Sequence, residues 1–139
     1  MSHSAYIHHK IFRSKHRKFR KILIFVKTAT MKNEAFKDKV VVVTGGAQGI
    51  GHCIAQEFEK NGARVYIIDK QEGPHYVGDI GRREVLEAFT RHVVSREGHI
   101  DILVNNALPI MKGLDECTWD DFQYAMSVGV TAPFYLTKL

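Results

Sequence analysis

Residues 39–51 have the sequence KVVVVTGGAQGIG, four valines followed by a glycine-rich turn. The valine run has no polar interruption, which is typical of a strand buried on both faces of a parallel sheet. A helical pattern follows and ends at Gly62, as a C-terminal glycine ends a helix. Its apolar residues at helical spacing are Ile50, Cys53, Ile54, Ala55 and Phe58. The stretch therefore predicts a buried strand, a turn and a helix in direct succession.

The glycines of the turn have a common physical purpose, which is close approach of the backbone. Gly45 allows the chain to turn sharply off the strand, and Gly51 allows the helix to pack tightly on the sheet. Gly49 removes the Cβ that would keep a pyrophosphate away from backbone N–H groups. Free amides and the positive dipole end of the helix then face the phosphates. The pattern predicts a dinucleotide-binding loop, and the alternative is a glycine-rich turn without a ligand.

The octapeptide Thr44–Gly51, TGGAQGIG, resembles the T-G-x-x-x-G-x-G signature of the short-chain dehydrogenases/reductases. The resemblance continues through Asn105-Asn106-Ala107 and covers about residues 36–139. It implies an α/β fold with a doubly wound, Rossmann-like parallel sheet. It also implies an oxidoreductase that interconverts alcohols and carbonyls by hydride transfer with a nicotinamide dinucleotide. The turn residues that it assigns to the cofactor are Gly45, Gln48, Gly49, Ile50 and Gly51.

A second buried strand is predicted over residues 63–68, and it ends at Asp69. Asp69 lies 18 residues after Gly51, close to the spacing of about 20 at which a carboxylate binds the adenosine ribose hydroxyls. Such a carboxylate repels a 2′-phosphate, and Gln48 stands where NADP-preferring relatives often carry a basic residue. NAD is therefore the predicted cofactor, although Lys70 softens the preference. The alternative is that Asp69 only ends the strand.

A short third strand over residues 75–77 leads into Gly78-Asp79-Ile80. The resemblance implies that Asp79 accepts a hydrogen bond from the adenine amino group and that Ile80 gives the base an apolar contact. Asp79 also has an alternative as a helix cap, because an amphipathic helix follows over residues 82–96. The isolated histidines His52, His92 and His99 are interpreted as structural or solvated, since they lack metal-ligand spacing.

The fourth strand is predicted over residues 100–104 and ends at Asn105. The resemblance implies that Asn105 and Asn106 tie neighbouring strands together through their amides, and that the backbone of Ala107 approaches the cofactor ribose. Leu108 stands where the family usually has glycine, so a different backbone conformation is required there.

The last helix is predicted to begin at Thr118, which forms a capping box with Asp121, and to reach Leu139 with a disturbance at Gly129 and Pro133. Gly129 falls at the place of the family's catalytic asparagine. The family's catalytic Ser, Tyr and Lys do not appear after the fourth strand, so no catalytic residue is assigned. Tyr6 and Lys10 match the family's Y-x-x-x-K spacing, but they precede the first strand and are interpreted as a coincidence. We therefore expect the incomplete, nucleotide-binding half of an enzyme, truncated after about four strands and the fourth helix and inactive alone. The alternatives are a non-catalytic NAD-binding or sensor module and an interaction protein.

The charge divides the chain into a basic tail, residues 1–33, and an incomplete domain, residues 34–139. The tail has nine Lys and Arg and no acid, whereas the rest has eleven against fifteen Asp and Glu. The tail has three interpretations: an amphipathic helix for membrane or nucleic acid, an organelle-targeting leader, or residues upstream of a real start at Met31. The last is favoured, so the tail is expected to be flexible or not native.

Two further expectations concern chemistry and assembly. Cys53 and Cys117 form no C-x-x-C pair, which favours a reduced, cytoplasmic protein without a metal site. The fourth strand would be an open parallel edge, so self-association is expected. The partners expected are the dinucleotide and, in the full-length protein, a small alcohol or carbonyl substrate.

Overall fold

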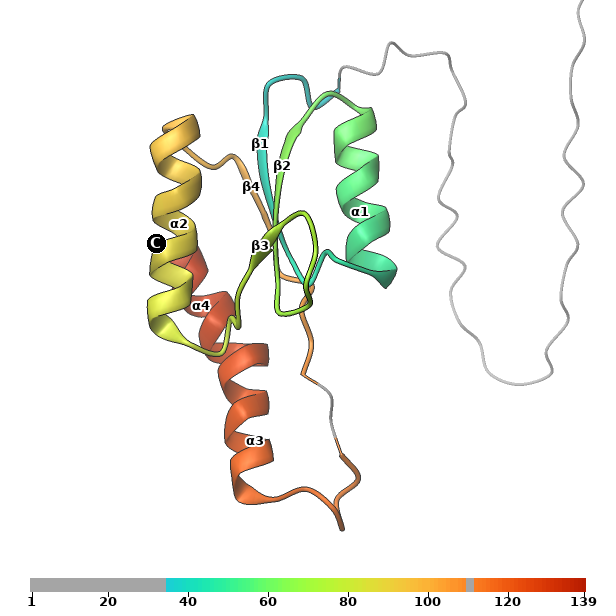
Figure 1. Cartoon of the computed structure of the whole chain (residues 1–139), viewed down its shortest axis with the longest axis vertical. Helices are drawn as coiled ribbons and strands as arrows, with labels where there is room; N and C mark the ends of the chain where they lie inside the picture. The colour runs from blue at the N-terminus through green and yellow to red at the C-terminus, as the bar shows by residue number, and fades with distance from the viewer. Residues whose placement is uncertain (1–34, 110–111) are drawn as a thin grey trace, which may run out of the picture.

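The computed structural model describes residues 35–109 and 112–139 (Figure 1). The predictions for the basic tail and for a start at Met31 lie outside the described residues. The strands are β1 (Val40–Thr44), β2 (Arg64–Asp69), β3 (Tyr76–Val77) and β4 (Ile102–Val104). The helices are α1 (Gly49–Lys60), α2 (Arg83–Glu97), α3 (Trp119–Met126), the π-helical η1 (Ser127–Thr131) and α4 (Ala132–Lys138).

All strand pairs of the described sheet are parallel, in the order β3-β2-β1-β4. In β1, Val41 lies between Val65 of β2 and Ile102 of β4, so both edges of this strand are paired. The valine run predicted a strand buried on both faces. Every residue of β1 is buried, as this prediction requires. The predicted α/β, doubly wound parallel sheet is confirmed.

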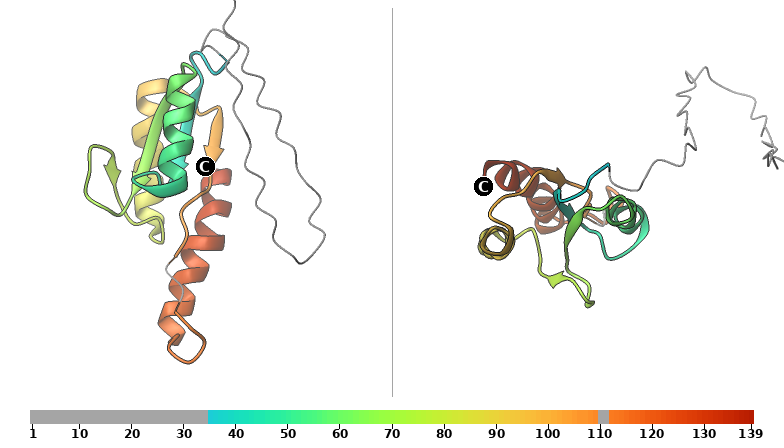
Figure 2. Two further views of the ribbon diagram at one scale, coloured as in Figure 1. Left: turned by 90° about the vertical axis from the view of Figure 1, so that its right-hand side faces the viewer. Right: turned by 90° about the horizontal axis from the view of Figure 1, so that it is seen from above.

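Alternate residues of β1 belong to two separate cores. Val41 and Val43 pack with Ala55 of α1 on one face, whereas Val40 and Val42 pack with Phe89 of α2 on the other. Seen from above, the sheet lies between α1 and the pair α2 and α4 (Figure 2). A sheet covered by helices on both faces is the arrangement that an uninterrupted apolar strand requires.

Helix α1 is fully buried against the sheet only at small residues, while Phe58 packs against the same core partly buried. Gly51 and Ala55 are its buried positions, whereas Ile50 is 76% exposed and Cys53 is also exposed. The helical spacing of Ile50 and Cys53 therefore does not correspond to burial of these two side chains. The helix lies so close to the turn before it that only a residue without a Cβ fits at its first contact, and the larger neighbours face outward.

The last predicted helix is interrupted where the sequence indicated. Thr118 accepts the Asp121 amide while the Asp121 carboxylate accepts the Thr118 amide, which confirms the capping box. The helix then widens into η1 around Gly129 and resumes as α4 with Pro133 in its first turn. A proline fits the first turn of a helix because its missing N–H has no partner there. Helix α3 thus projects beyond the carboxyl ends of the strands, and α4 returns to the sheet (Figure 1).

Candidate dinucleotide-binding site

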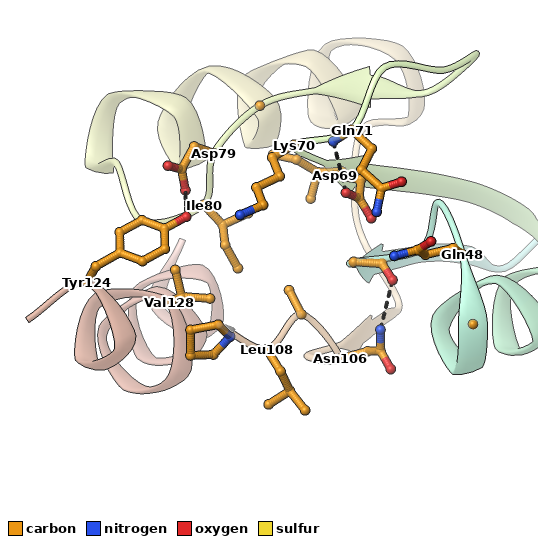
Figure 3. A pocket seen from close by; sticks show the side chains of 16 residues that line it. Gln48, Asp69, Lys70, Gln71, Asp79, Ile80, Asn106, Leu108, Tyr124 and Val128 are labelled. Carbon is orange, nitrogen blue, oxygen red and sulfur yellow. Dashed lines mark hydrogen bonds between the residues drawn. The ribbon is translucent and has the colours of Figure 1, made fainter. Parts of the chain in front are cut away.

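A cavity of about 310 Å³ opens at the carboxyl ends of β1 and β2. Open parallel sheets bind ligands in this position, outside the carboxyl ends of their strands. The walls come from the turn before α1, the ends of β2 and β3, the segment after β4, and α3 with η1 (Figure 3). The predicted cofactor residues in these walls are Gly45, Gln48, Gly49, Asp69, Lys70, Asp79, Ile80, Asn106 and Ala107.

The turn between β1 and α1 depends on two glycines for different reasons. Gly45 has φ +67°, and a Cβ there would lie 2.7 Å from the Ala107 Cα. Gly49 has φ +59°, but a Cβ there would meet no atom within 4 Å. Gly45 is therefore required by the protein's own packing. Gly49 combines a left-handed backbone with an open approach from the cavity, which is what a ligand against the helix amides needs.

The start of α1 offers unpaired amides to this cavity. Its N-cap residue, Gln48, makes no side-chain capping hydrogen bond, and the first turn contains no acidic residue. The first amides of a helix have no intrahelical acceptor, and the helix dipole adds positive potential at this end. The geometry therefore suits an anionic group such as a phosphate.

Asn106 holds the turn against the segment after β4. Its side-chain Nδ2 donates to the Thr44 carbonyl at 3.1 Å and to the Gly45 carbonyl at 2.9 Å. In return, the Thr44 hydroxyl accepts the amides of Asn106 at 3.0 Å and Ala107 at 3.1 Å. A Cβ at Gly51 would lie 2.3 Å from the Gly45 carbonyl oxygen, which confirms that close packing of α1 requires this glycine.

Asp69 is held in place by backbone amides at the end of β2. One carboxylate oxygen accepts the amide of Ala47 at 3.1 Å, and the other accepts the amide of Gln71 at 3.1 Å. The residue is only 8% exposed, yet it forms part of the cavity wall. The carboxylate therefore does more than end a strand, because it fixes the glycine-rich turn beside it.

Asp79 makes its hydrogen bonds through one oxygen. Oδ1 accepts the Gly81 amide at 2.8 Å and the Tyr124 hydroxyl at 3.0 Å. Helix α2 begins later, with Arg82 as its N-cap and without a side-chain cap. Asp79 thus closes the turn before α2 rather than capping the helix itself.

Three predicted residues do not line this cavity. Ile50 is on the exposed side of α1, and Gly51 is buried beneath the turn. Asn105 lines a different cavity, together with Leu103 and Leu136. Asn106 ties β1 to the segment after β4 as the resemblance implied, whereas Asn105 faces the other side of the sheet edge.

Tyr124 and Val128 also line the cavity, although neither was predicted as a site residue from the sequence. They lie four residues apart and therefore share one side of the helical segment. That spacing is the signal that could have found them. The spacing of Tyr124 and Val128 is hard to recognise in the sequence, because the same segment contains the apolar residues Trp119, Phe122 and Met126. These three side chains are at least 41% exposed in the structure.

Among residues 35–109 and 112–139, the histidines outside the cavity make local contacts. His99 bonds the Asp101 carboxylate at 3.1 Å, and His92 packs against the Tyr76 ring at 5.4 Å. Within residues 35–109 and 112–139, no three His, Cys, Asp or Glu side chains are grouped as metal ligands. None of the helices in this part of the chain has the length and apolar character to cross a membrane.

Comparison with known families decides the relationship. The family model described as short chain dehydrogenase matches residues 39–139, which include every strand and helix described above. The chain belongs to the short-chain dehydrogenase family. The glycine-rich turn, Asp69, and the Asn105-Asn106-Ala107 segment all lie within the matched residues.

Curated members of the short-chain dehydrogenase family are identical to this chain at about a third of the aligned residues. Momilactone A synthase of Oryza sativa subsp. japonica is 37% identical over 117 residues, and L-fucose dehydrogenase of Oryctolagus cuniculus is 36% identical over 118. The alignments cover 72% and 75% of this chain but 43% and 42% of those proteins. The chain thus spans less than half the length of these relatives.

Solved structures of family members share the fold. A 3-ketoacyl-(acyl-carrier-protein) reductase from Brucella melitensis, complexed with NADH, matches with a TM-score of 0.66 at 26% identity. A short-chain dehydrogenase from Burkholderia cenocepacia J2315, in complex with NADP, matches with a TM-score of 0.69 at 27% identity. The matches cover 75% and 74% of this chain and 49% of each of those chains. Both forms of nicotinamide dinucleotide thus occur among the structural neighbours.

Proposed function

We propose that the cavity binds NAD and that the chain forms the dinucleotide-binding half of an oxidoreductase that interconverts an alcohol and a carbonyl. The observation that carries the proposal is the open space at Gly49, which we call the ligand cradle. It is bounded by the first amides of α1 and by the fixed carboxylate of Asp69. A bound dinucleotide supplies the hydride chemistry, while the protein positions it.

We assign different residues of the cavity to different parts of the dinucleotide. We assign the phosphates to the backbone of Gly45, Gln48, Gly49 and the start of α1, and the adenosine ribose to Asp69. Asp79 and Ile80 take the adenine, and the backbone at Ala107 takes the second ribose. Asn106 acts through the turn that it holds rather than by contact. Leu108 is 84% exposed at the cavity edge, so its side chain leaves the approach open.

Asp69 favours NAD over NADP in this assignment. Its carboxylate is anchored by two amides, so it cannot swing away from an incoming 2′-phosphate without breaking them. Lys70 acts in the opposite sense, because it lines the same cavity and is exposed. We propose that the fixed carboxylate outweighs the exposed ammonium, since a buried acceptor repels a phosphate more strongly than a solvated lysine attracts it.

We further propose that the 139 residues by themselves bind NAD without turning over a substrate. Oxidation or reduction of the substrate oxygen needs a proton donor or acceptor beside the nicotinamide. Gly129 contributes no side chain where the resemblance expects an asparagine, and the family's Ser, Tyr and Lys are not found after the fourth strand. The same glycine favours a second candidate function, a non-catalytic NAD-binding module.

Titration of NADH and NADPH against the 139-residue chain tests the proposal. NADH should bind at least about tenfold more tightly than NADPH, a difference of about 1.4 kcal/mol. Gly49→Val should weaken NADH binding by at least about tenfold, because a branched side chain would stand between the ligand and the helix amides. Gly98→Val is the matched control, since Gly98 has φ +79° and open space around it but lies outside the cavity.

Three outcomes contradict parts of this proposal. Tighter binding of NADPH than of NADH would overturn the assignment to Asp69. Equal losses of NADH affinity in Gly49→Val and Gly98→Val would show that backbone strain, and not the ligand cradle, caused the effect. NADH oxidation by the 139-residue chain with a carbonyl substrate would contradict the proposed lack of turnover.

A further inference from the structure

Tyr124 connects two parts of the fold that are far apart in sequence. It belongs to α3, whereas Asp79 lies 45 residues earlier, after β3. Its hydroxyl donates to Asp79 Oδ1 at 3.0 Å, so the helix reaches across one end of the cavity to the carboxylate (Figure 3). Both residues line the cavity, and this bond therefore forms part of its wall.

The two carboxylate oxygens of Asp79 differ in the hydrogen bonds that they accept. Oδ1 accepts both the Gly81 amide and the Tyr124 hydroxyl, which use its two lone pairs. Oδ2 accepts no hydrogen bond from the described residues. With Oδ1 held by two donors, the orientation of the carboxylate is fixed, and Oδ2 keeps its acceptor capacity.

The ring of Tyr124 lies near Gly81 and Lys70. A Cβ built at Gly81 would lie 3.0 Å from the ring carbon Cε2, so the absence of a side chain at Gly81 permits this contact. The Lys70 ammonium lies 5.8 Å from the ring centroid on the side of β2. Partial burial, and then the hydrogen bond to Asp79, raise the pKa of the Tyr124 phenol above its usual 10.0. The hydroxyl thus remains a donor throughout the neutral range.

We infer that Tyr124 is a positioning residue for base recognition: it fixes the Asp79 carboxylate so that Oδ2 accepts the exocyclic amino group of an adenine. The inference rests on the proposed dinucleotide function and deepens it. Tyr124 does not contact the reacting atoms. Its role is to distinguish a base that carries an amino group from one that does not, because a ligand hydrogen bond is strong only when the acceptor is already oriented.

The inference is tested by measuring how tightly the 139-residue chain binds NADH and its deamino analogue, reduced nicotinamide hypoxanthine dinucleotide. In the deamino analogue a carbonyl oxygen replaces the exocyclic amino group from which Asp79 is expected to accept a hydrogen bond, and N1 carries a hydrogen. The chain should prefer NADH by about tenfold, the size of one hydrogen bond to a charged group. Tyr124→Phe removes only the hydroxyl and should reduce this preference to about threefold or less, because the released carboxylate turns toward solvent.

Tyr135→Phe is the matched control. The Tyr135 hydroxyl also donates to a carboxylate, Glu87 Oε1 at 2.6 Å, but neither residue lines the cavity. This variant should keep the wild-type ratio of the two affinities. Gly81→Ala gives an independent perturbation, since the new methyl group must displace the Tyr124 ring or the Asp79 oxygen, and it should also reduce the ratio.

A change in folding stability alone would alter both affinities equally and leave their ratio unchanged. The inference is therefore overturned if Tyr124→Phe retains the wild-type ratio, or if the wild-type chain binds the two ligands equally well. A wild-type chain that binds neither dinucleotide overturns the proposed function and this inference together.

Discussion

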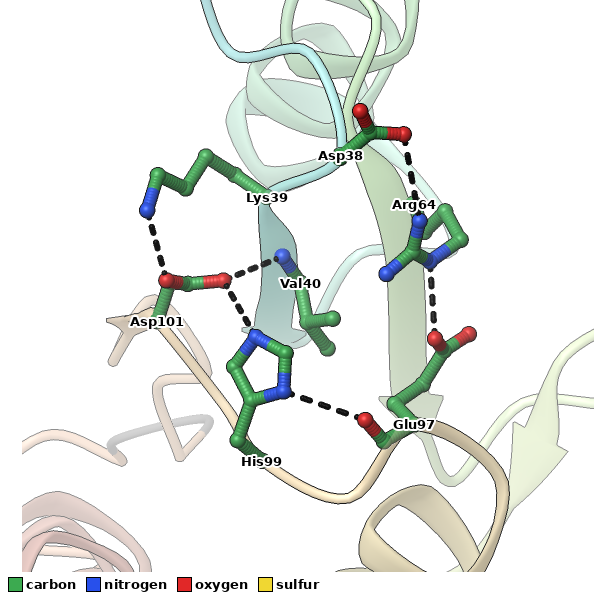
Figure 4. A network of polar contacts seen from close by, with 7 residues as sticks. All are labelled: Asp38, Lys39, Val40, Arg64, Glu97, His99 and Asp101. Carbon is green, nitrogen blue, oxygen red and sulfur yellow. Dashed lines mark hydrogen bonds and ion pairs between the residues drawn. The ribbon is translucent and has the colours of Figure 1, made fainter.

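Asp101 joins the amino ends of β1 and β4, at the opposite end of the sheet from the cavity. Its carboxylate accepts the Lys39 ammonium at 2.9 Å, the Val40 amide at 2.8 Å and the His99 ring at 3.1 Å (Figure 4). Arg64 bonds Glu97 at 2.7 Å in the same region. The Lys39 ammonium, and then the Val40 amide, lower the pKa of the Asp101 carboxyl from 3.8 to about 2.

This depressed pKa predicts a loss of stability in acid. Between pH 3.8 and about 2 the unfolded chain takes up a proton at Asp101 that the folded protein does not. The contribution of Asp101 is thus fully present above pH 3.8 and is lost as the pH falls toward 2. Asp101→Asn should make the free energy of unfolding, measured in urea, depend less steeply on pH across this window.

Asp115→Asn serves as the control for this prediction, because Asp115 is an exposed residue of the loop before α3. It should leave the pH dependence unchanged. Asp121 also has a pKa of about 2, caused first by Lys112 and then by Thr118, so some acid dependence should persist in Asp101→Asn. Identical acid profiles for wild type and Asp101→Asn would refute the role given to Asp101.

At the scale of the elements, two glycines should respond to alanine in opposite directions. Gly129 lies within η1, and a Cβ there would approach only Pro109, at 4.0 Å. Gly129→Ala should raise the free energy of unfolding by about 0.5–1 kcal/mol, because glycine loses more backbone entropy in a helix. Gly98 ends α2 with φ +79°. Gly98→Ala should lower the free energy by about 1–2 kcal/mol, because a Cβ is strained in that conformation.

Urea unfolding of the two variants measures both signs in one experiment. Each site has room for a methyl group, so packing does not separate them, and the difference isolates backbone conformation. Destabilisation by Gly129→Ala would show that the π-helical turn needs the freedom of glycine, and would contradict this account of η1.

The elements that could be predicted from sequence are those in which local preference and tertiary environment agree. The valine run of β1 and the capping box at Thr118 are examples, because their residue types fit one structure only. Asp69 was also recognisable, since its distance in sequence from Gly51 follows from one strand–helix–strand unit. The glycines of the turn were predictable because they belong to the same strand–helix–strand unit.

Other features depend on contacts between distant segments, which spacing along one element does not reveal. The Tyr124–Asp79 hydrogen bond requires α3 to lie beside the turn after β3. The exposure of Ile50 follows from how closely α1 approaches the turn before it. Trp119 of α3 is 73% exposed, because no described element covers that side of the helix.

At the scale of the whole molecule, two surfaces of the described residues favour association. β4 is an edge of the sheet, and its outer backbone groups can pair with another strand. The outer side of α3, η1 and α4 also exposes large apolar side chains: Trp119, Phe122, Met126, Val130 and Phe134. Several exposed apolar side chains along one helical segment are more than a folded monomer usually tolerates.

We therefore expect the 139-residue chain to self-associate through this apolar side. In sedimentation velocity at high protein concentration, the wild type should form species larger than a monomer. Phe122→Lys combined with Phe134→Lys should shift the distribution toward monomer, because charged side chains resist burial without partners. Leu114→Lys is the control, since Leu114 is 94% exposed but lies in the loop before α3. A monodisperse wild-type monomer would disprove the expectation, and association that survives the double substitution would point instead to the edge of β4.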